Sequence, residues 1–317
     1  MLANSKLSIT IPTYNRADFL DASLKFHVPF LKDHNIAIYI SDNSSSDDTK
    51  LVAEKWIKEY PLIHYHCNKS NVGPDANFEM ALRLPTSKYV WLLGDTYILP
   101  EEGIRYILAK LDDGISYDAI VFNLLKKVDI QTKDYADNNL LLTDLSGLMS
   151  CLSCLIYNEK LIEQADFSRY YNSNFIQTGI IFEFISNKNA RVHWVQNHTV
   201  ELLQHHLKPK KSWRETPQAI EIGVERWLNF IFSLPPSYSL ENKLIAAKSF
   251  GVASNLLKLR GLLSMRADGA LTFRRLIKYR QAFILSTGVA KFLLALGLCL
   301  IPVFLLAKVK KIAQRRS

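Results

Sequence analysis

Four short polar clusters in the first hundred residues carry the side chains best suited to chemistry. Each follows an apolar run and is rich in Asp, Asn, Ser or Gly: Pro12–Arg16, Ser41–Ser45, Asn68–Asn77 and Gly94–Tyr97. Carboxylates accept hydrogen bonds from N–H and O–H groups, and a guanidinium offers charge-assisted donors to a phosphate. Turns favour the same residue types, so one cluster alone indicates little. Four clusters at one edge of a sheet favour a ligand site.

The elements that must position these clusters alternate along the chain. Apolar runs typical of strands cover residues 7–11, 36–40, 62–66, 89–93 and 119–122, and we expect the first to stop at Pro12. Helical patterns lie between them at 17–31, 48–60, 74–84 and 101–111. This alternation predicts an α/β fold with a mostly parallel sheet covered by helices on both faces. Ligands bind such sheets at the carboxyl ends of the strands, where the clusters lie.

Four motifs in this order and at this spacing resemble those of family 2 glycosyltransferases, which have a GT-A fold. They are Ile9-Thr-Ile-Pro-Thr-Tyr-Asn-Arg16, Ser41-Asp-Asn-Ser-Ser-Ser-Asp-Asp-Thr49, Asn71-Val-Gly-Pro-Asp-Ala-Asn-Phe78 and Val90-Trp-Leu-Leu-Gly-Asp95. The third motif is similar to that of abequosyltransferase-like enzymes, which build O-antigen or capsule units. The resemblance is strong over about residues 5–125, weak to about 205 and only general beyond.

The resemblance implies a site for a nucleotide-sugar donor. The implied donor-binding residues are Pro12, Thr13, Tyr14, Asn15, Arg16, Asp42, Asn43, Gly73, Asp75, Asn77 and Asp95. Asp42 would accept a hydrogen bond from the base or ribose, Arg16 would donate to a phosphate, and Gly73 would allow a close approach of the backbone to the ligand.

Each of these roles has a structural alternative. Asp42 would cap the turn that follows it, and Arg16 would form a surface ion pair with Asp18 or Asp21. Asp75 and Asn77 would cap the helix predicted from Pro74.

Asp95 matters most for the mechanism, because the family places an Asp-rich metal motif at this strand end. The motif reads Gly94-Asp95-Thr96-Tyr97, so one carboxylate remains of up to three. Three interpretations follow: Mg²⁺ or Mn²⁺ held by Asp95 with phosphates and water, metal-independent transfer with Arg16 or a helix N-terminus holding the phosphates, or loss of catalysis.

An inverting transferase also needs a general base for the acceptor hydroxyl. The segment Gln177-Thr-Gly-Ile-Ile-Phe-Glu183 is similar to the family's acceptor-side helix, so Glu183 is the first candidate and Asp166 the second. Gln177 would line the same pocket. His205 and His206 would be a late metal or phosphate ligand, or ordinary surface residues.

The charge of the chain is concentrated at its C-terminal end. The formal net charge is +9, yet residues 248–317 carry +13 and the remainder carries −4. The sixteen residues from Phe292 to Ala307 are uncharged, or about 24 Å as a helix, and basic residues flank them on both sides. Segment 283–307 is therefore predicted to lie in an anionic membrane surface, with a membrane span and a buried soluble helix as alternatives. The mildly acidic remainder argues against a nucleic-acid partner.

Two parts are expected along the chain: residues 1–207 as the GT-A donor and acceptor domain, and residues 208–317 as a helical region with the membrane-associating segment. No signal peptide is expected, so the cysteines should be reduced, and Cys151 and Cys154 would be buried thiols or, less simply, a metal or redox pair. The implied function is inverting transfer of a sugar to a polyprenyl-diphosphate-linked glycan at the cytoplasmic face of the bacterial inner membrane. The alternative is an inactive member that acts as a membrane-bound partner in an assembly complex.

Overall fold

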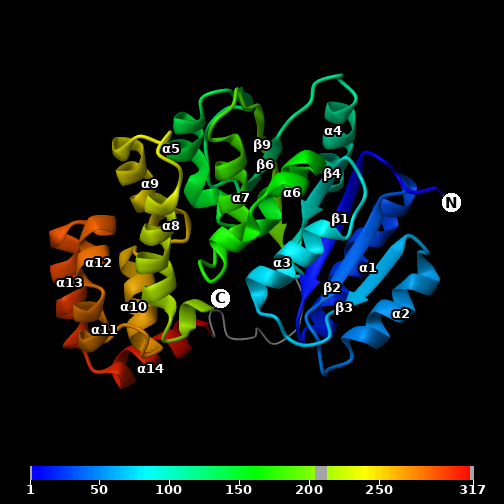
Figure 1. Ribbon diagram of the computed structural model, residues 1–317. Coiled ribbons are helices and arrows are strands. Elements are labelled where there is room, and N and C mark those ends of the chain that lie inside the picture. Colours follow the sequence, from blue (N-terminus) through cyan, green and yellow to red (C-terminus); the bar gives the residue numbers. More distant parts are fainter. Residues whose placement is uncertain (1, 204–212, 315–317) are drawn as a thin grey trace. The chain divides into compact units, whose positions relative to one another are not determined.

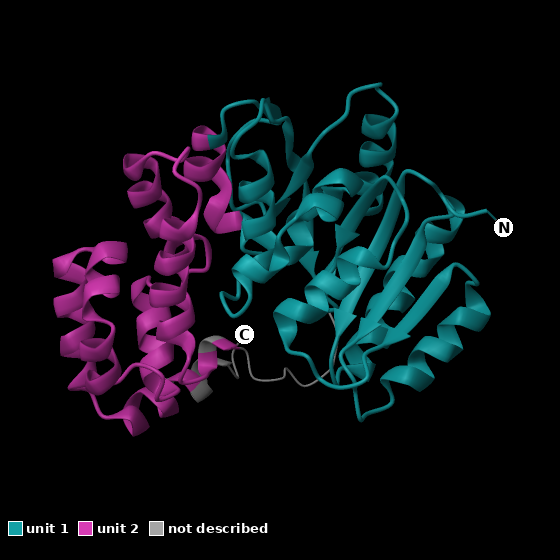
Figure 2. Cartoon of the chain, in the orientation of Figure 1, with its two compact units in different colours: residues 1–138, 149–207 teal, residues 139–148, 208–317 magenta. Residues whose placement is uncertain are grey.

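The computed structural model describes residues 2–203 and 213–314 (Figure 1). Two compact units divide the chain, and Figure 2 colours them separately. Unit 1 contains residues 1–138 and 149–207, and unit 2 contains residues 139–148 and 208–317. We describe each unit by itself.

Unit 1 is built on a mixed sheet with the strand order β3-β2-β1-β4-β8-β6-β9-β5, in which β7 also pairs with β9. The strands are β1 (Leu7–Thr13), β2 (Ala37–Asp42), β3 (Ile63–Cys67), β4 (Tyr89–Leu92), β5 (Tyr97–Ile98), β6 (Ala119–Leu124), β7 (Lys133–Tyr135), β8 (Leu155–Asn158) and β9 (Val192–Leu202). Strands β1 to β4 are parallel to one another. All seven residues of β1 are buried, as expected for a central strand covered on both faces.

Helices cover this sheet where the apolar periodicity predicts them. The helices of unit 1 are α1 (Ala17–Asp33), α2 (Thr49–Glu59), α3 (Pro74–Arg83), α4 (Glu101–Leu111), α6 (Glu159–Gln164) and α7 (Ile176–Ile185), with 3-10 turns η1 (Leu152–Cys154) and η2 (Phe167–Tyr170). Helix α3 packs on β1 and β2 and contacts α6 and α7, and α1 packs against α2. Pro74 is the first residue of α3, a position that does not need its missing N–H.

Strand β1 runs through Pro12 to Thr13, so the expectation that it stops at Pro12 is wrong. Thr10 faces β4, because its carbonyl accepts from the N–H of Leu93 at 2.8 Å. Pro12, two residues on, faces the same side, but β4 pairs with β1 only up to Leu92. No neighbouring strand therefore needs the N–H that Pro12 lacks.

Three strands join the sheet by antiparallel pairing. Strand β8 lies between β4 and β6 and is antiparallel to both, while β5 and β7 are antiparallel to β9. The segment 134–139 contributes to β7 and to the start of α5 (Asn138–Met149). The sheet therefore stays mostly parallel only in its first half and along β6 and β9.

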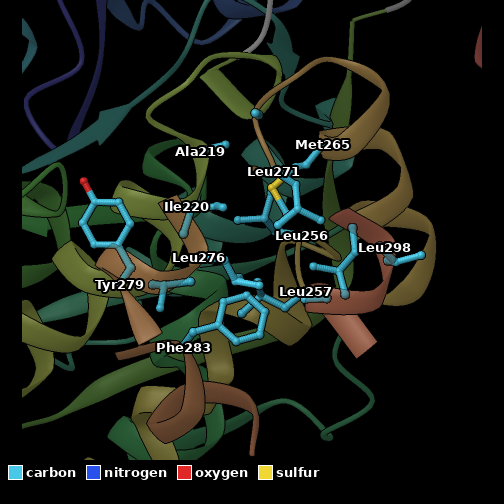
Figure 3. Close-up of a cluster of buried hydrophobic side chains, with 14 of the residues drawn as sticks. Ala219, Ile220, Leu256, Leu257, Met265, Leu271, Leu276, Tyr279, Phe283 and Leu298 are labelled. Atoms are coloured by element: carbon cyan, nitrogen blue, oxygen red, sulfur yellow. The ribbon is translucent and has the colours of Figure 1, made fainter. Parts of the chain in front are cut away.

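Unit 2 is helical and has its own apolar core. It contains most of α5, the 3-10 turn η3 (Trp213–Glu215), the π-helical turn η4 (Glu221–Arg226), α8 (Trp227–Ser233), α9 (Leu240–Ala253), α10 (Leu259–Ala267), α11 (Phe273–Lys278), α12 (Arg280–Thr287), α13 (Val289–Cys299) and α14 (Val303–Gln314). Figure 3 shows part of that core, in which Leu256, Leu276 and Phe283 point toward one another.

The apolar segment 283–307 is not one continuous helix. Gly288, with φ at +88°, separates α12 from α13, and α14 begins after Pro302. Phe292, Ala295 and Leu298 face the core of unit 2. No helix within the described ranges is both long and apolar enough to cross a membrane.

Candidate active site

The carboxyl ends of β1, β2 and β3 place three predicted site segments side by side. In the parallel register Thr13 lies opposite Asp42, and Asp42 lies opposite Cys67. The ladder continues one residue further, since Asn43 N–H donates to the Thr13 carbonyl at 2.9 Å. The strand order therefore brings residues more than 50 positions apart to one edge of the sheet.

Asp42 is buried at this edge and is held by three donors. Its Oδ1 accepts from the Ser45 N–H at 2.9 Å and from the Ser45 hydroxyl at 2.5 Å. Its Oδ2 accepts from the Tyr65 hydroxyl at 2.7 Å. Burial, together with the Asp42 carboxylate, raises the pKa of Tyr65 above its usual range, so the phenol stays a donor. A carboxylate offers about four acceptor positions, and these donors occupy three of them on Asp42.

The loop after β1 is fixed by the loop after β2. Asn15 adopts a left-handed conformation with φ at +51°. Its N–H donates to the Ser45 hydroxyl at 2.7 Å, and its side-chain oxygen accepts from the Ser46 N–H at 2.7 Å. Next to it, Tyr14 is 44% exposed, so the base of a nucleotide could stack on its ring. The buried Thr13 hydroxyl has no hydrogen-bond partner among the described residues.

Asn43 and Asn77 hold the polar loops together. The Asn43 amide donates to Asn71 Oδ1 at 3.0 Å and to the Gly73 carbonyl at 3.1 Å, and it accepts from Asn68 Nδ2 and the Val72 N–H. Its four hydrogen-bonding positions are thus used within the protein.

Asn77, in the first turn of α3, accepts from the Ser41 hydroxyl at 2.8 Å and donates to the Ser41 carbonyl at 3.1 Å. We interpret both asparagines as residues that position the loops rather than as residues that contact a nucleotide-sugar donor.

Gly73 is required for its backbone conformation. Its φ of +86° and ψ of 167° lie in a region that side-chain-bearing residues rarely adopt. A β-carbon at Gly73 would meet no atom within 4 Å, so crowding by the protein is not the reason for the glycine. Gly73 precedes α3, and Asp75 is buried in the first turn of that helix, where an acidic residue favours the positive helix end.

The predicted pair between Arg16 and Asp18 or Asp21 is wrong, because Arg16 pairs with Asp95. The Nε of Arg16 lies 2.7 Å from Asp95 Oδ2, and the guanidinium lies 4.1 Å from the centre of the Phe19 ring. Asp21 instead accepts from Lys55 and Trp56. The pair links the cluster after β1 to the cluster after β4 and leaves the two terminal nitrogens of Arg16 for a ligand.

The turn that carries Asp95 is fixed at both ends. The Gly94 N–H donates to the Ser153 hydroxyl at 3.0 Å. The Leu99 N–H donates to Nε2 of the buried His27 at 3.0 Å, and Nδ1 of His27 bonds the Ser23 carbonyl at 2.7 Å. Burial lowers the pKa of His27 to about 4, so the ring is neutral and Nε2 can accept.

The donor set at this edge fits a divalent cation only in part. Asp95 is the one carboxylate of the Gly94-Asp95-Thr96-Tyr97 turn, and a cationic side chain already contacts it. Within the described residues, no three His, Cys, Asp or Glu side chains are grouped in a way that would hold a metal ion. A cation at Asp95 would need most of its ligands from the diphosphate and water.

Glu183 lies on α7 and is held by two donors. Its Oε1 accepts from Arg169 at 2.9 Å and its Oε2 from the Tyr170 hydroxyl at 2.6 Å. Burial, together with the Glu183 carboxylate, raises the pKa of Tyr170 above its usual range. Asp166 is on the surface, where the Ser168 hydroxyl lowers its pKa and weakens it as a base.

Gln177, also on α7, is buried, and its Nε2 donates to the Ser150 carbonyl at 2.9 Å. His205 and His206 lie outside the described residues. Cys151 and Cys154 are free thiols, and Cys154 is buried.

The sequence pattern did not single out Ser45, Tyr65, His27 or Ser153. Ser45 follows Asp42 by three residues, which is the spacing of a side-chain turn and is the one local signal among them. Tyr65, His27 and Ser153 act on residues 23, 72 and 59 positions away, so only the fold reveals them.

Comparisons with known proteins agree with this fold. The family model "Glycosyl transferase family 2" matches residues 8–177. Abequosyltransferase RfbV of Salmonella typhimurium is 26% identical over 219 residues, which cover 60% of this chain and 64% of that protein. The GalNAc(5)-diNAcBac-PP-undecaprenol beta-1,3-glucosyltransferase of Campylobacter jejuni is 28% identical over 138 residues, or 43% of each chain. The chain thus spans less than two thirds of the length of these relatives.

Two solved structures share the fold over most of their length. TarS of S. aureus, residues 1–349, in complex with UDP-GlcNAc matches with a TM-score of 0.58 and 14% identity, covering 98% of this chain and 92% of that one. The mannosyltransferase PcManGT of Pyrobaculum calidifontis, in complex with GDP-Man and Mn²⁺, matches with a TM-score of 0.57 and 16% identity, covering 93% and 87%. The predicted GT-A fold with additional C-terminal helices is confirmed.

Proposed function

This chain belongs to glycosyl transferase family 2, and from that premise we propose that it moves a sugar from a nucleotide-sugar donor to a lipid-linked glycan, with inversion at the anomeric carbon. The observation that carries the proposal is the edge of the sheet at which Thr13 ends β1, Asp42 ends β2, and Asp95, paired with Arg16, follows β4. The edge offers acceptors for a nucleoside and cationic donors for a diphosphate, which are the two chemistries of such a donor.

The donor class is supported by the structural relatives and by the residues. TarS is described with UDP-GlcNAc and PcManGT with GDP-Man and Mn²⁺. In this chain the remaining acceptor position of Asp42 would take an N–H or O–H of the base or ribose, while the exposed Tyr14 ring would cover the base. The two terminal nitrogens of Arg16 would donate to the diphosphate.

Asp95 is the residue that would hold a divalent cation together with the diphosphate. Such a cation would neutralise the charge that develops on the leaving nucleoside diphosphate. The guanidinium of Arg16 supplies positive charge at the same carboxylate, so Arg16 would share in binding the leaving group. Metal dependence is therefore a quantity to measure for this chain, with Mn²⁺ and Mg²⁺ as the first ions to test.

The transfer step needs a base on the acceptor side. The acceptor hydroxyl oxygen forms the new bond to the anomeric carbon as the bond to the diphosphate breaks, and its proton passes to a carboxylate. We assign this role to Glu183. Its two donors orient the carboxylate, and its side chain is 28% exposed, so it remains accessible to an acceptor.

The lipid-linked acceptor is supported by two observations. One relative is named for GalNAc(5)-diNAcBac-PP-undecaprenol, a glycan carried on a polyprenol, and another is named an abequosyltransferase. Unit 2 exposes large apolar side chains on α13, on α14 and on the short connection between them, among them Leu293, Leu300 and Phe304. We propose that this apolar face rests on the anionic cytoplasmic surface of a bacterial membrane, with basic residues beside it, and that the product is a surface polysaccharide such as O-antigen or capsule.

Nucleotide binding by the full-length chain tests the transferase proposal. UDP, GDP and dTDP are titrated by calorimetry with and without Mn²⁺, followed by the corresponding nucleotide-sugars. We expect one nucleotide to bind. We also expect Asp95→Asn to abolish sugar transfer. Asp18 is an exposed aspartate of α1, so Asp18→Asn is the control and should leave transfer unchanged. If no nucleoside diphosphate binds at millimolar concentration, the enzyme proposal fails and the inactive-partner alternative takes its place.

A further inference from the structure

Unit 2 contains a pocket whose lining is dominated by cations. The pocket has a volume of about 610 Å³. Its lining residues come from the segment that enters η4 and from α11 and the residue after it: Pro217, Gln218, Glu221, Arg274, Arg275, Lys278 and Tyr279. We call it the basic pocket. Neither the family model, which ends at residue 177, nor the proposed transferase site accounts for it.

The three cations of the basic pocket have no carboxylate in direct contact within the described residues. Within the described part of the chain, Arg274, Arg275 and Lys278 take part in no ion pair. Arg275 is held in place by neutral groups, because its Nη1 donates to the carbonyls of Gly269 at 2.8 Å and Ala270 at 3.1 Å. Its full charge therefore stays available to a ligand.

The single carboxylate of the pocket, Glu221, is already balanced by a residue outside the lining. Arg226 donates to Glu221 Oε1 from Nε at 3.0 Å and from Nη2 at 2.7 Å. The Tyr279 hydroxyl donates to Glu221 Oε2 at 3.0 Å and accepts from Lys278 Nζ at 2.9 Å. Glu221 thus orients Tyr279 and Lys278. Glu221 and Glu225 also attract Lys278 at longer range, and the lining still carries three cations against one carboxylate.

The ligand that fits this arrangement is a phosphate. Guanidinium groups bind phosphate oxygens through paired N–H donors, and a lysine ammonium adds a point charge. On the same short helix, Phe273 and Ile277 are one turn apart and are 58% and 37% exposed. Apolar side chains beside a phosphate-binding cluster favour a phosphate that carries an apolar chain.

We propose that the basic pocket binds a phosphate ester or diphosphate, either as the headgroup of a membrane lipid or as a soluble phosphate. The proposal concerns binding to unit 2 and does not depend on transferase activity. It is therefore tested by binding alone, and its failure is distinct from failure of the nucleotide titration described above.

The test compares two double variants of the full-length chain that lose the same charge. The pocket variant is Arg274→Gln with Lys278→Gln, and the control is Arg260→Gln with Lys258→Gln. All four side chains are exposed, so both variants are expected to fold, and equal urea midpoints check this. Arg275 is left unchanged because it supports the backbone around Gly269.

Inorganic pyrophosphate is titrated by calorimetry, and vesicles of phosphatidylcholine with and without phosphatidylglycerol are sedimented with each variant. We expect the pocket variant to bind pyrophosphate at least about tenfold more weakly than the control, since it lacks two of the three cations that would donate to the phosphate oxygens. Pyrophosphate bound elsewhere on the chain affects both variants equally and cancels in the comparison.

The vesicle arm identifies the source of the phosphate. A matching loss of binding to phosphatidylglycerol vesicles in the pocket variant supports a lipid headgroup. Unchanged vesicle binding with weakened pyrophosphate binding supports a soluble phosphate. Equal pyrophosphate affinity in the two double variants would overturn the proposal, because the charge would then act diffusely rather than through the pocket.

Discussion

Asp42 combines a structural and a binding role in one side chain. Ser45 and Tyr65 take three of its acceptor positions, which explains why its predicted turn-capping role and its predicted donor role do not exclude each other. Replacement by alanine would remove both roles at once and would not separate them. The isosteric asparagine keeps an oxygen for Ser45. It removes the charge and replaces the oxygen that accepts from Tyr65 with an NH2 group.

We expect Asp42→Asn to weaken binding of the nucleoside diphosphate by roughly 10- to 100-fold, the effect of losing a hydrogen bond to a charged group of about 1.5–3 kcal/mol. Calorimetric titration measures the affinity. Asp48→Asn, the same change at an exposed position, serves as the control and should leave the affinity unchanged. An Asp42→Asn affinity equal to that of the control would remove Asp42 from the donor site.

Glu183 has two possible roles that a test must separate. It could act as the general base, or it could only stabilise η2 through its hydrogen bonds to Arg169 and Tyr170. A glutamine at this position can still accept from Arg169 with its oxygen and donate to the Tyr170 hydroxyl with its amide nitrogen, but it cannot take a proton. We expect Glu183→Gln to lower kcat by about 10²- to 10⁴-fold, with little change in donor affinity and in the urea midpoint. Glu163→Gln, at an exposed position of α6, is the control. A kcat within a few-fold of the control would assign Glu183 a structural role only.

Local sequence predicts a residue's chemistry better than its partner. The three-residue spacing of Asp42 and Ser45 is readable along the chain, and the hydrogen bond is present. For Arg16, the nearest acids along the helix were Asp18 and Asp21, yet its partner is Asp95, 79 residues away. The reason is that β1 and β4 are neighbours in the sheet, and strand order is not encoded in any single motif.

At the scale of elements, α1 supports the site through His27. The neutral imidazole joins the Ser23 carbonyl of α1 to the Leu99 N–H, which closes the segment that begins at Asp95. A protonated ring would lose the acceptor at Nε2, so the segment depends on the deprotonated form.

This contact predicts a pH dependence of stability. Burial lowers the pKa of His27 from 6.5 to about 4, so between these values the unfolded chain binds more protons than the folded one. The contribution of neutral His27 to the free energy of unfolding is therefore complete above pH 6.5 and decreases as the pH falls toward 4. From pH 7.5 to pH 5 we expect a loss of about 2 kcal/mol in the free energy of unfolding from this residue. Urea unfolding of the wild type and His27→Gln measures it, and equal pH slopes for the two proteins would contradict the assignment.

The elements that sequence predicts well are those with enough local signal. The parallel strands β1 to β4 and β6 and the helices between them follow continuous apolar runs or amphipathic periods, and they lie close to the predicted positions. Strands β5 and β7 have two and three residues and exist because β9 pairs with them. Strand β8 enters between β4 and β6 with the opposite direction, which an alternating strand–helix pattern does not indicate.

At the scale of the whole molecule, the apolar side chains of the C-terminal segment fall into two groups. Some pack in the core of unit 2, others are exposed, and a hydropathy pattern does not separate the two groups. The sequence predicted that residues 283–307 lie in a membrane surface, and the structure divides them among separate helices at Gly288 and Pro302. One side of these helices completes the core of unit 2 through Phe283 and Phe292. Deleting the segment would therefore unfold the unit, and any loss of membrane binding would have no clear meaning.

The membrane proposal is tested instead on the side chains that the core does not use. Leu300 and Phe304 are 82% and 71% exposed, so replacing both with glutamine should leave the urea midpoint unchanged. Inserting each side chain into a membrane would contribute about 1.5–3 kcal/mol, so we expect the double variant to partition into phosphatidylglycerol-containing vesicles roughly 100-fold less. Leu51→Gln with Leu240→Gln, at two other exposed leucines, is the control. If both double variants sediment with vesicles to the same extent, α13 and α14 do not form the membrane face, and the acceptor must reach the transferase by another surface.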